Sequence, residues 1–302
     1  MSQDVGVQVP PRAPDSHYDT LPPMSTNLTP FGVTDYNPNE TEEFRNIIDK
    51  ASQVFDARAY RRIKTPTIEF YDSLAKGLGP SLKQKAVKFF DPNGQVLLLR
   101  PDNTTPIARL VATRMNNDTL PIKLSYIDPI FRQSSDSLEG SIERFQAGVE
   151  LIGDSSADAD AEVIITCIEA LKQIGNCDFG IDIGHTELVN GLSEEKRQAL
   201  LDNDYLSYGE IPARGDAGVV KNNKALSSLS SILNNKGYAD SVTYNTGLVK
   251  DLHYYSGVIF EAYDKKTKKI IASGGRYDGL LEKFGYAQPA VGFAIKIDAL
   301  QG

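Results

Sequence analysis

Apolar segments joined by hairpin turns constrain the fold of this 302-residue chain more than any other feature. Phe89-Phe90 and Val96–Leu99 flank Asp91-Pro92-Asn93-Gly94, a cluster of turn-forming residues that predicts a β-hairpin. Segments 254–263 and 269–273 flank a charged turn and predict a second hairpin. Strands joined in this way pair antiparallel, and helical patterns fall between the strand blocks rather than after every strand. The sequence therefore predicts an α+β fold, an antiparallel sheet flanked by helices, rather than alternating βαβ units.

The chain is predicted to consist of an amino-terminal extension and one folded domain. Residues 1–28 are rich in proline and lack apolar periodicity, so we expect a disordered extension there. The helix that follows is expected to begin at Asn39 as its N-cap. A helical pattern near 187–240 indicates an insertion within the domain that spans 29–302.

Composition works against several classes of site and partner. The chain carries 32 Lys and Arg against 40 Asp and Glu, a net charge of −8, whereas nucleic acids are bound first by basic residues. Two cysteines, Cys167 and Cys177, and three histidines exclude a disulfide framework and make a metal site unexpected. No segment approaches the 18 or so apolar residues of a membrane span, and the amino terminus has no apolar signal core. We therefore expect a cytoplasmic protein without a membrane partner.

Polar residues recur on otherwise apolar strands. Gln146 and Glu150 are four residues apart on one predicted strand and therefore point to the same face. Taken singly, such residues have structural explanations: an Arg132–Glu150 ion pair, core tyrosines, a glycine turn. Together they indicate a sheet face whose polar groups need a polar ligand or network. The other members of this set are Arg132, Tyr254, Tyr255 and the glycine-rich segment 274–279.

Several short motifs carry a resemblance to a known family. They are Thr65-Pro-Thr-Ile-Glu69, Leu99-Arg-Pro-Asp-Asn-Thr104, Phe131-Arg132, Phe145-Gln-Ala-Gly-Val-Glu150, Leu252-His-Tyr-Tyr255, Gly274-Gly-Arg-Tyr-Asp278 and Val291-Gly-Phe-Ala-Ile295. In order and spacing they resemble the catalytic core of class II histidyl-tRNA synthetases, from about Thr29 to Ala299. The resemblance implies a class II antiparallel sheet flanked by helices, a homodimer and a histidine pocket on one sheet face.

The same resemblance implies roles for individual residues. Asp102 and Thr104 match positions that hold the α-amino group of histidine, and Gln146 matches one near its carboxylate. Glu150 and Tyr254 match the pair that recognises the imidazole, since a carboxylate and a phenol can satisfy both ring nitrogens. The remaining pocket candidates are Tyr255 and Tyr277, which match pocket walls, and Arg132, which matches a phosphate-handling arginine.

The motifs depart from the synthetase pattern where ATP would be handled. Lys250 replaces the arginine expected to stabilise the adenylation transition state, and lysine lacks its planar fork. Ala299 replaces an arginine that clamps ATP, and the run Gly-Arg-x-Arg-Glu-Phe becomes Gly140-Ser-Ile-Glu-Arg-Phe145, which has no arginine at either arginine position of the run. Losing positive charge where phosphate charge develops removes several kcal/mol of catalysis per group. We therefore expect no histidine activation and no aminoacylation.

With these losses, and with the Asp-Leu-His-Tyr-Tyr-Ser-Gly stretch at 251–257, the chain resembles the regulatory subunits of ATP phosphoribosyltransferase. The resemblance implies a non-catalytic chain without an anticodon-binding domain and without a cofactor of its own. Its partner would be a short catalytic subunit that binds Mg-ATP and phosphoribosyl pyrophosphate in the first step of histidine biosynthesis. It further implies a homodimer within a hetero-octamer, activation of that subunit, and a part in allosteric feedback inhibition by histidine.

Two other interpretations remain. A divergent histidyl-tRNA synthetase or histidine-activating ligase on the same core would catalyse histidine-dependent ATP–pyrophosphate exchange. A tRNA-binding module without chemistry would need a basic surface despite the net charge of −8.

Overall fold

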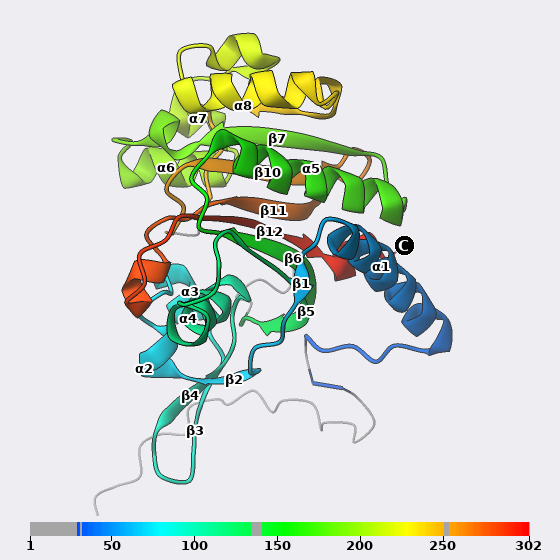
Figure 1. Ribbon diagram of the computed structural model, residues 1–302, viewed down its shortest axis with the longest axis vertical. Helices are drawn as coiled ribbons and strands as arrows, with labels where there is room; N and C mark the ends of the chain where they lie inside the picture. Colours follow the sequence, from blue (N-terminus) through cyan, green and yellow to red (C-terminus); the bar gives the residue numbers. More distant parts are fainter. Residues whose placement is uncertain (1–28, 31, 134–140, 251–253, 302) are drawn as a thin grey trace, which may run out of the picture.

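The computed structural model describes residues 29–30, 32–133, 141–250 and 254–301 (Figure 1). The extension predicted at 1–28 lies outside these residues, as does His253 of the tyrosine motif.

A nine-stranded sheet forms the centre of the fold. Its strand order is β1-β5-β6-β12-β11-β10-β7-β9-β8, and neighbours from β5 to β7 all pair antiparallel. Only the pairs β1–β5 and β7–β9 are parallel among the described strands. The strands are β1 Arg61–Arg62, β5 Ile122–Phe131, β6 Glu143–Ile152, β7 Phe179–His185, β8 Arg214–Gly215, β9 Thr243–Asn245, β10 Val258–Asp264, β11 Ile270–Arg276 and β12 Ala290–Lys296.

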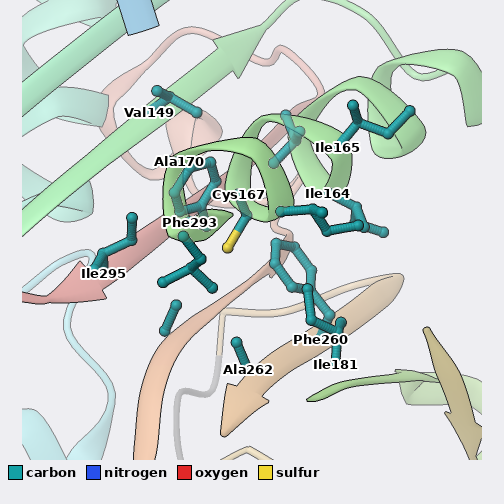
Figure 2. Packing of buried hydrophobic residues seen from close by; sticks show 14 of the residues in the cluster. Val149, Ile164, Ile165, Cys167, Ala170, Ile181, Phe260, Ala262, Phe293 and Ile295 are labelled. Atoms are coloured by element: carbon teal, nitrogen blue, oxygen red, sulfur yellow. The ribbon is translucent and has the colours of Figure 1, made fainter. Parts of the chain in front are cut away.

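Three long helices lie along one side of this sheet: α1 (Pro38–Ala57), α5 (Ala157–Ile174) and α8 (Lys224–Asn235) (Figure 1). The hydroxyl of Ser156 accepts the Ala159 N–H and starts α5, and Gly175, with φ 76°, ends it. Figure 2 shows Cys167 on the inward side of α5 beside Phe260 and Phe293 of the sheet. Burial raises the pKa of the Cys167 thiol, as fits a core residue.

The opposite sheet face is covered by α4 (Thr104–Arg114) and the 3-10 turn η4 (Leu281–Phe284). A second sheet of order β2-β4-β3 lies beyond them, built from β2 (Ile68–Phe70), β3 (Lys88–Phe90) and β4 (Val96–Leu99) (Figure 1). Two short helices, α2 Tyr71–Leu74 and α3 Pro80–Lys85, accompany it.

The region predicted as a helical insertion is mostly helical and also contains β8. Its elements are η1 Thr186–Val189, α6 Glu194–Leu201, α7 Tyr205–Tyr208, η2 Ala217–Val220, α8 and η3 Ala239–Ser241. The chain continues through β9 to β12 and a last 3-10 turn, η5 Ile297–Leu300. Every helix among the described residues is too short or too polar to span a bilayer.

Both predicted hairpins are present, as β3–β4 and β10–β11, and the predicted fold class is confirmed. The prediction of Asn39 as N-cap was wrong, because Asn37 caps α1. Its side chain accepts the N–H groups of Asn39 and Glu40, while the Glu40 carboxylate accepts the Asn37 N–H at 2.8 Å. Pro38 at the first helical position favours this earlier start, since it lacks an N–H that would need a partner.

Candidate functional site

Three segments converge on the face of the main sheet opposite α5. The loop between β4 and α4 supplies Asp102, the first position of α4 supplies Thr104, and β6 supplies Gln146 and Glu150. The turn after β11 supplies Tyr277. Tyr254 and Tyr255, which precede β10, pack with these residues. The structure thus brings together groups that lie up to 175 positions apart, from Asp102 to Tyr277.

Glu150 lies at the centre of this site and is 1% exposed. The hydroxyl of Thr104 donates to its Oε1 at 2.8 Å, and the hydroxyl of Tyr277 donates to its Oε2. Beneath it, a Cβ on Gly292 would lie 1.7 Å from Oε2, so only glycine leaves room for the carboxyl group. Burial raises the pKa of Glu150 to about 8, although both hydrogen bonds oppose this shift. The group is therefore mostly protonated at neutral pH.

Asp102 is the second buried acid of the site. The Thr105 hydroxyl donates to its Oδ2 at 2.9 Å, whereas Oδ1 has no hydrogen-bond partner among the described residues. Burial raises the pKa of Asp102 to about 6, and the positive charge of Arg132 lowers it. Arg132 itself donates from Nε to the carbonyl of Pro101 at 2.6 Å. An unpartnered buried carboxylate oxygen is the expected mark of a ligand group such as an ammonium.

Three tyrosine rings pack against one another at the site. The ring centroids of Tyr254 and Tyr255 are 5.0 Å apart, and those of Tyr254 and Tyr277 are 5.8 Å apart. Tyr254 is 8% exposed and Tyr277 is 2% exposed. Burial, together with the charge of Glu150, raises the pKa of Tyr277 well above its usual value. Glu150 and these two tyrosines are therefore buried, whereas Thr104 and Tyr255 at the edge of the site are partly exposed.

Some site residues were missed by the sequence reasoning. Asn103 donates from Nδ2 to Gln146 Oε1 at 3.2 Å and so links the loop to β6. Tyr126 faces the site because it pairs with Gly148 in the β5–β6 register. Thr105, which hydrogen-bonds Asp102, lies directly beside the motif that was singled out. Asn103 and Thr105 could have been found from this adjacency, but Tyr126 depends on strand register.

Lys250 and Ala299, which replace arginines of the synthetase pattern, contact other residues of this chain. Lys250 places its amino group against the Glu261 carboxylate, and its side chain is only 14% exposed. Ala299 lies in η5 and packs against the main core. Among the described residues, no group of three or more His, Cys, Asp or Glu side chains is placed to hold a metal ion.

Comparison with known proteins identifies the family. The histidyl-tRNA synthetase family model matches residues 32–207 and 210–300. A protein from Halothermothrix orenii named ATP phosphoribosyltransferase regulatory subunit is 36% identical over 320 residues, covering 92% of this chain and 77% of that protein. One of the same name from Acetivibrio thermocellus is 36% identical over 311 residues, covering 89% and 74%. The chain belongs to this family of regulatory subunits.

Solved structures agree with the assignment to the ATP phosphoribosyltransferase regulatory subunit family. A crystal structure from Bacillus halodurans, described as an ATP phosphoribosyltransferase regulatory subunit/histidyl-tRNA synthetase, superposes with a TM-score of 0.82 at 32% identity. The superposition covers 91% of this chain and 83% of the Bacillus halodurans chain. A histidine–tRNA ligase subunit from Alicyclobacillus acidocaldarius shares the fold, with a TM-score of 0.77 at 23% identity over 92% of this chain and 96% of that one. The predicted family and class II fold are therefore confirmed.

Proposed function

We propose that this chain is a non-catalytic regulatory subunit that binds and activates a short catalytic ATP phosphoribosyltransferase subunit in histidine biosynthesis. The names of its relatives support the regulatory role. The observation that carries the proposal is a contrast between the residues around Glu150 and those at two arginine positions of the synthetase pattern. Acidic and phenolic groups suited to an amino acid surround Glu150, whereas Lys250 is neutralised by Glu261 and Ala299 carries no charge. Such a site can hold histidine but lacks the preorganised cations that adenylation requires.

Histidine is the ligand that we propose for the Glu150 site, as part of feedback inhibition. The unpartnered Oδ1 of Asp102 would accept the α-ammonium group, and Glu150 with Tyr254 would contact the imidazole. In calorimetric titration with L-histidine, Asp102→Asn and Tyr254→Phe should each weaken binding at least tenfold. As a matched control, Asp72→Asn on the separate helix α2 should leave the affinity unchanged. Equal affinity in all four proteins would place histidine elsewhere.

We also propose that two copies of this chain associate through the β2-β4-β3 sheet, as part of a hetero-octamer with the catalytic subunit. Ile68 is 52% exposed, Phe70 54% and Phe90 72%. This small sheet therefore carries exposed apolar side chains, which are typical of a protein–protein interface. In this proposal Mg-ATP and phosphoribosyl pyrophosphate bind the catalytic subunit. Residues 29–302 form one synthetase-like domain with an insertion at 187–240. The protein acts in the cytoplasm and does not bind tRNA.

Light scattering after size-exclusion chromatography tests the assembly. The chain alone should elute with the mass of a dimer, and its equimolar mixture with the short catalytic subunit should elute as one larger species of eight chains. Separate elution of the two proteins would contradict the proposal. Histidine-dependent ATP–pyrophosphate exchange by the isolated chain would instead support a divergent synthetase.

A further inference from the structure

A cavity lies beside Tyr255, between the insertion and the start of β10. Its volume is about 320 Å³. Volumes of this order are typical of small-molecule sites. Its walls include Val189, Val249 and Ile259, which are 4%, 8% and 1% exposed. These three walls are apolar, whereas Thr186, Glu194, Arg197 and Lys250 make the rest of the lining largely polar.

One cation in this cavity, Arg197, has no ion-pair partner among the described residues. Arg197 on α6 donates from Nη2 to the backbone carbonyl of Lys250 at 3.4 Å, and it makes no other hydrogen bond or ion pair within the described residues. Lys250 also lines the cavity, but Glu261 neutralises its amino group. Glu194 lies at the exposed rim and forms no ion pair with Arg197 in the described structure. A partly buried guanidinium with free N–H groups is suited to a planar anion.

The cavity adjoins the Glu150 site across Tyr255, which contributes to both. In the sheet register Glu150 pairs with Gly292, Gly292 with Gly275, and Gly275 with Ile259, so these residues form one row across four strands. The ring of Tyr255 lies over Gly275, where an added Cβ would be 2.9 Å from its carbons. Tyr255 thus stands between Glu150 on one side and the cavity floor at Ile259 on the other.

We propose that this cavity binds a small organic carboxylate with a short branched apolar body. The carboxylate would accept hydrogen bonds from the guanidinium of Arg197, and the apolar body would pack on Val249 and Ile259. Binding there requires no displacement of Tyr277 from Glu150. The proposal is independent of the regulatory function and of histidine binding.

Ligand-observed saturation-transfer NMR on the full chain tests this site with two probes of equal shape. Isobutyrate carries the carboxylate, and isobutyramide is its neutral isostere. We expect isobutyrate to bind the wild-type protein at least fivefold more tightly than the amide. Arg197→Ala should abolish this preference, whereas Lys196→Ala should retain it. Lys196 is the matched control because it is the adjacent residue on α6, carries the same charge, and lies over the ring of Tyr208 at 5.7 Å.

Three results would overturn the proposal. They are equal binding of the two probes by the wild-type chain, saturation transfer to neither probe, and an equal loss of preference in the Lys196→Ala and Arg197→Ala proteins. The comparison of probes on the wild-type chain needs no variant, so it decides the question even if Arg197→Ala fails to fold.

Discussion

The buried carboxyl group of Glu150 should make the stability of this protein fall as pH rises from 5 to 7. Its pKa is about 8 in the folded chain, because burial disfavours the charged form, against about 4.3 for an unfolded glutamate. Because the folded-state pKa is higher than the unfolded-state pKa, the stabilisation is complete at pH values below the unfolded-state pKa. It is lost progressively as the pH rises toward 8. Replacing Glu150 with glutamine, which mimics the protonated acid, should remove this contribution.

The size of the effect follows from the pH interval. Each pH unit between the unfolded and folded pKa values changes the free energy of unfolding by about 1.4 kcal/mol, so two units give roughly 3 kcal/mol. Asp102, whose pKa burial raises to about 6, acts in the same direction and is present in both proteins. Glu150→Gln should therefore lose roughly 3 kcal/mol less stability than wild type between pH 5 and pH 7.

Urea unfolding followed by circular dichroism at pH 5, 6 and 7 measures this difference. Glu42→Gln, on the exposed side of α1, is the matched control and should follow the wild-type curve. Parallel pH dependences for wild type and Glu150→Gln would show that Glu150 is charged in the folded protein. The reasoning from burial would then be refuted.

Three further predictions concern stability and association. Arg100→Ala removes a fully buried guanidinium from its ion pair with Asp128 at 3.0 Å and should destabilise the protein by about 3–5 kcal/mol in urea unfolding. Arg61→Ala removes one partner of an exposed ion pair at 3.5 Å and should change stability by less than about 1 kcal/mol. Gly292→Ala should destabilise by roughly 1–3 kcal/mol, because its Cβ would overlap a buried carboxylate oxygen, and a wild-type melting curve would contradict this. Phe70→Ser should shift the chain from dimer to monomer in sedimentation velocity. Leu206 is more exposed but lies on the insertion, so Leu206→Ser should leave the dimer intact. The reverse result would show that the dimer interface lies on the insertion and not on the small sheet.

Features that depend on local pattern were predictable from the sequence. Turn residues between apolar pairs identified both hairpins, and the period of two along β6 placed Gln146 and Glu150 on one face. The motif at 99–104 located the segment that carries Asp102 and Thr104, at the start of α4. In each case the deciding interaction lies within a few residues along the chain.

Features that depend on register and long-range packing were not predictable. The contact of Tyr277 with Glu150 requires β12 to lie between β6 and β11, which no local pattern specifies. The isolated cation at Arg197 emerges only where α6 packs near Lys250. The ring contacts of Tyr254 with Tyr255 and Tyr277 likewise depend on packing, because the residue types alone do not specify how rings from separate segments stack.

The rate of phosphoribosyl-ATP formation by the short catalytic subunit tests the regulatory role most directly. The subunit would be assayed alone and with increasing amounts of this chain, with and without L-histidine. Our account predicts that the rate rises several-fold, saturates at one copy of this chain per catalytic chain, and falls when histidine is added. A rate equal to that of the catalytic subunit alone at every ratio would contradict it.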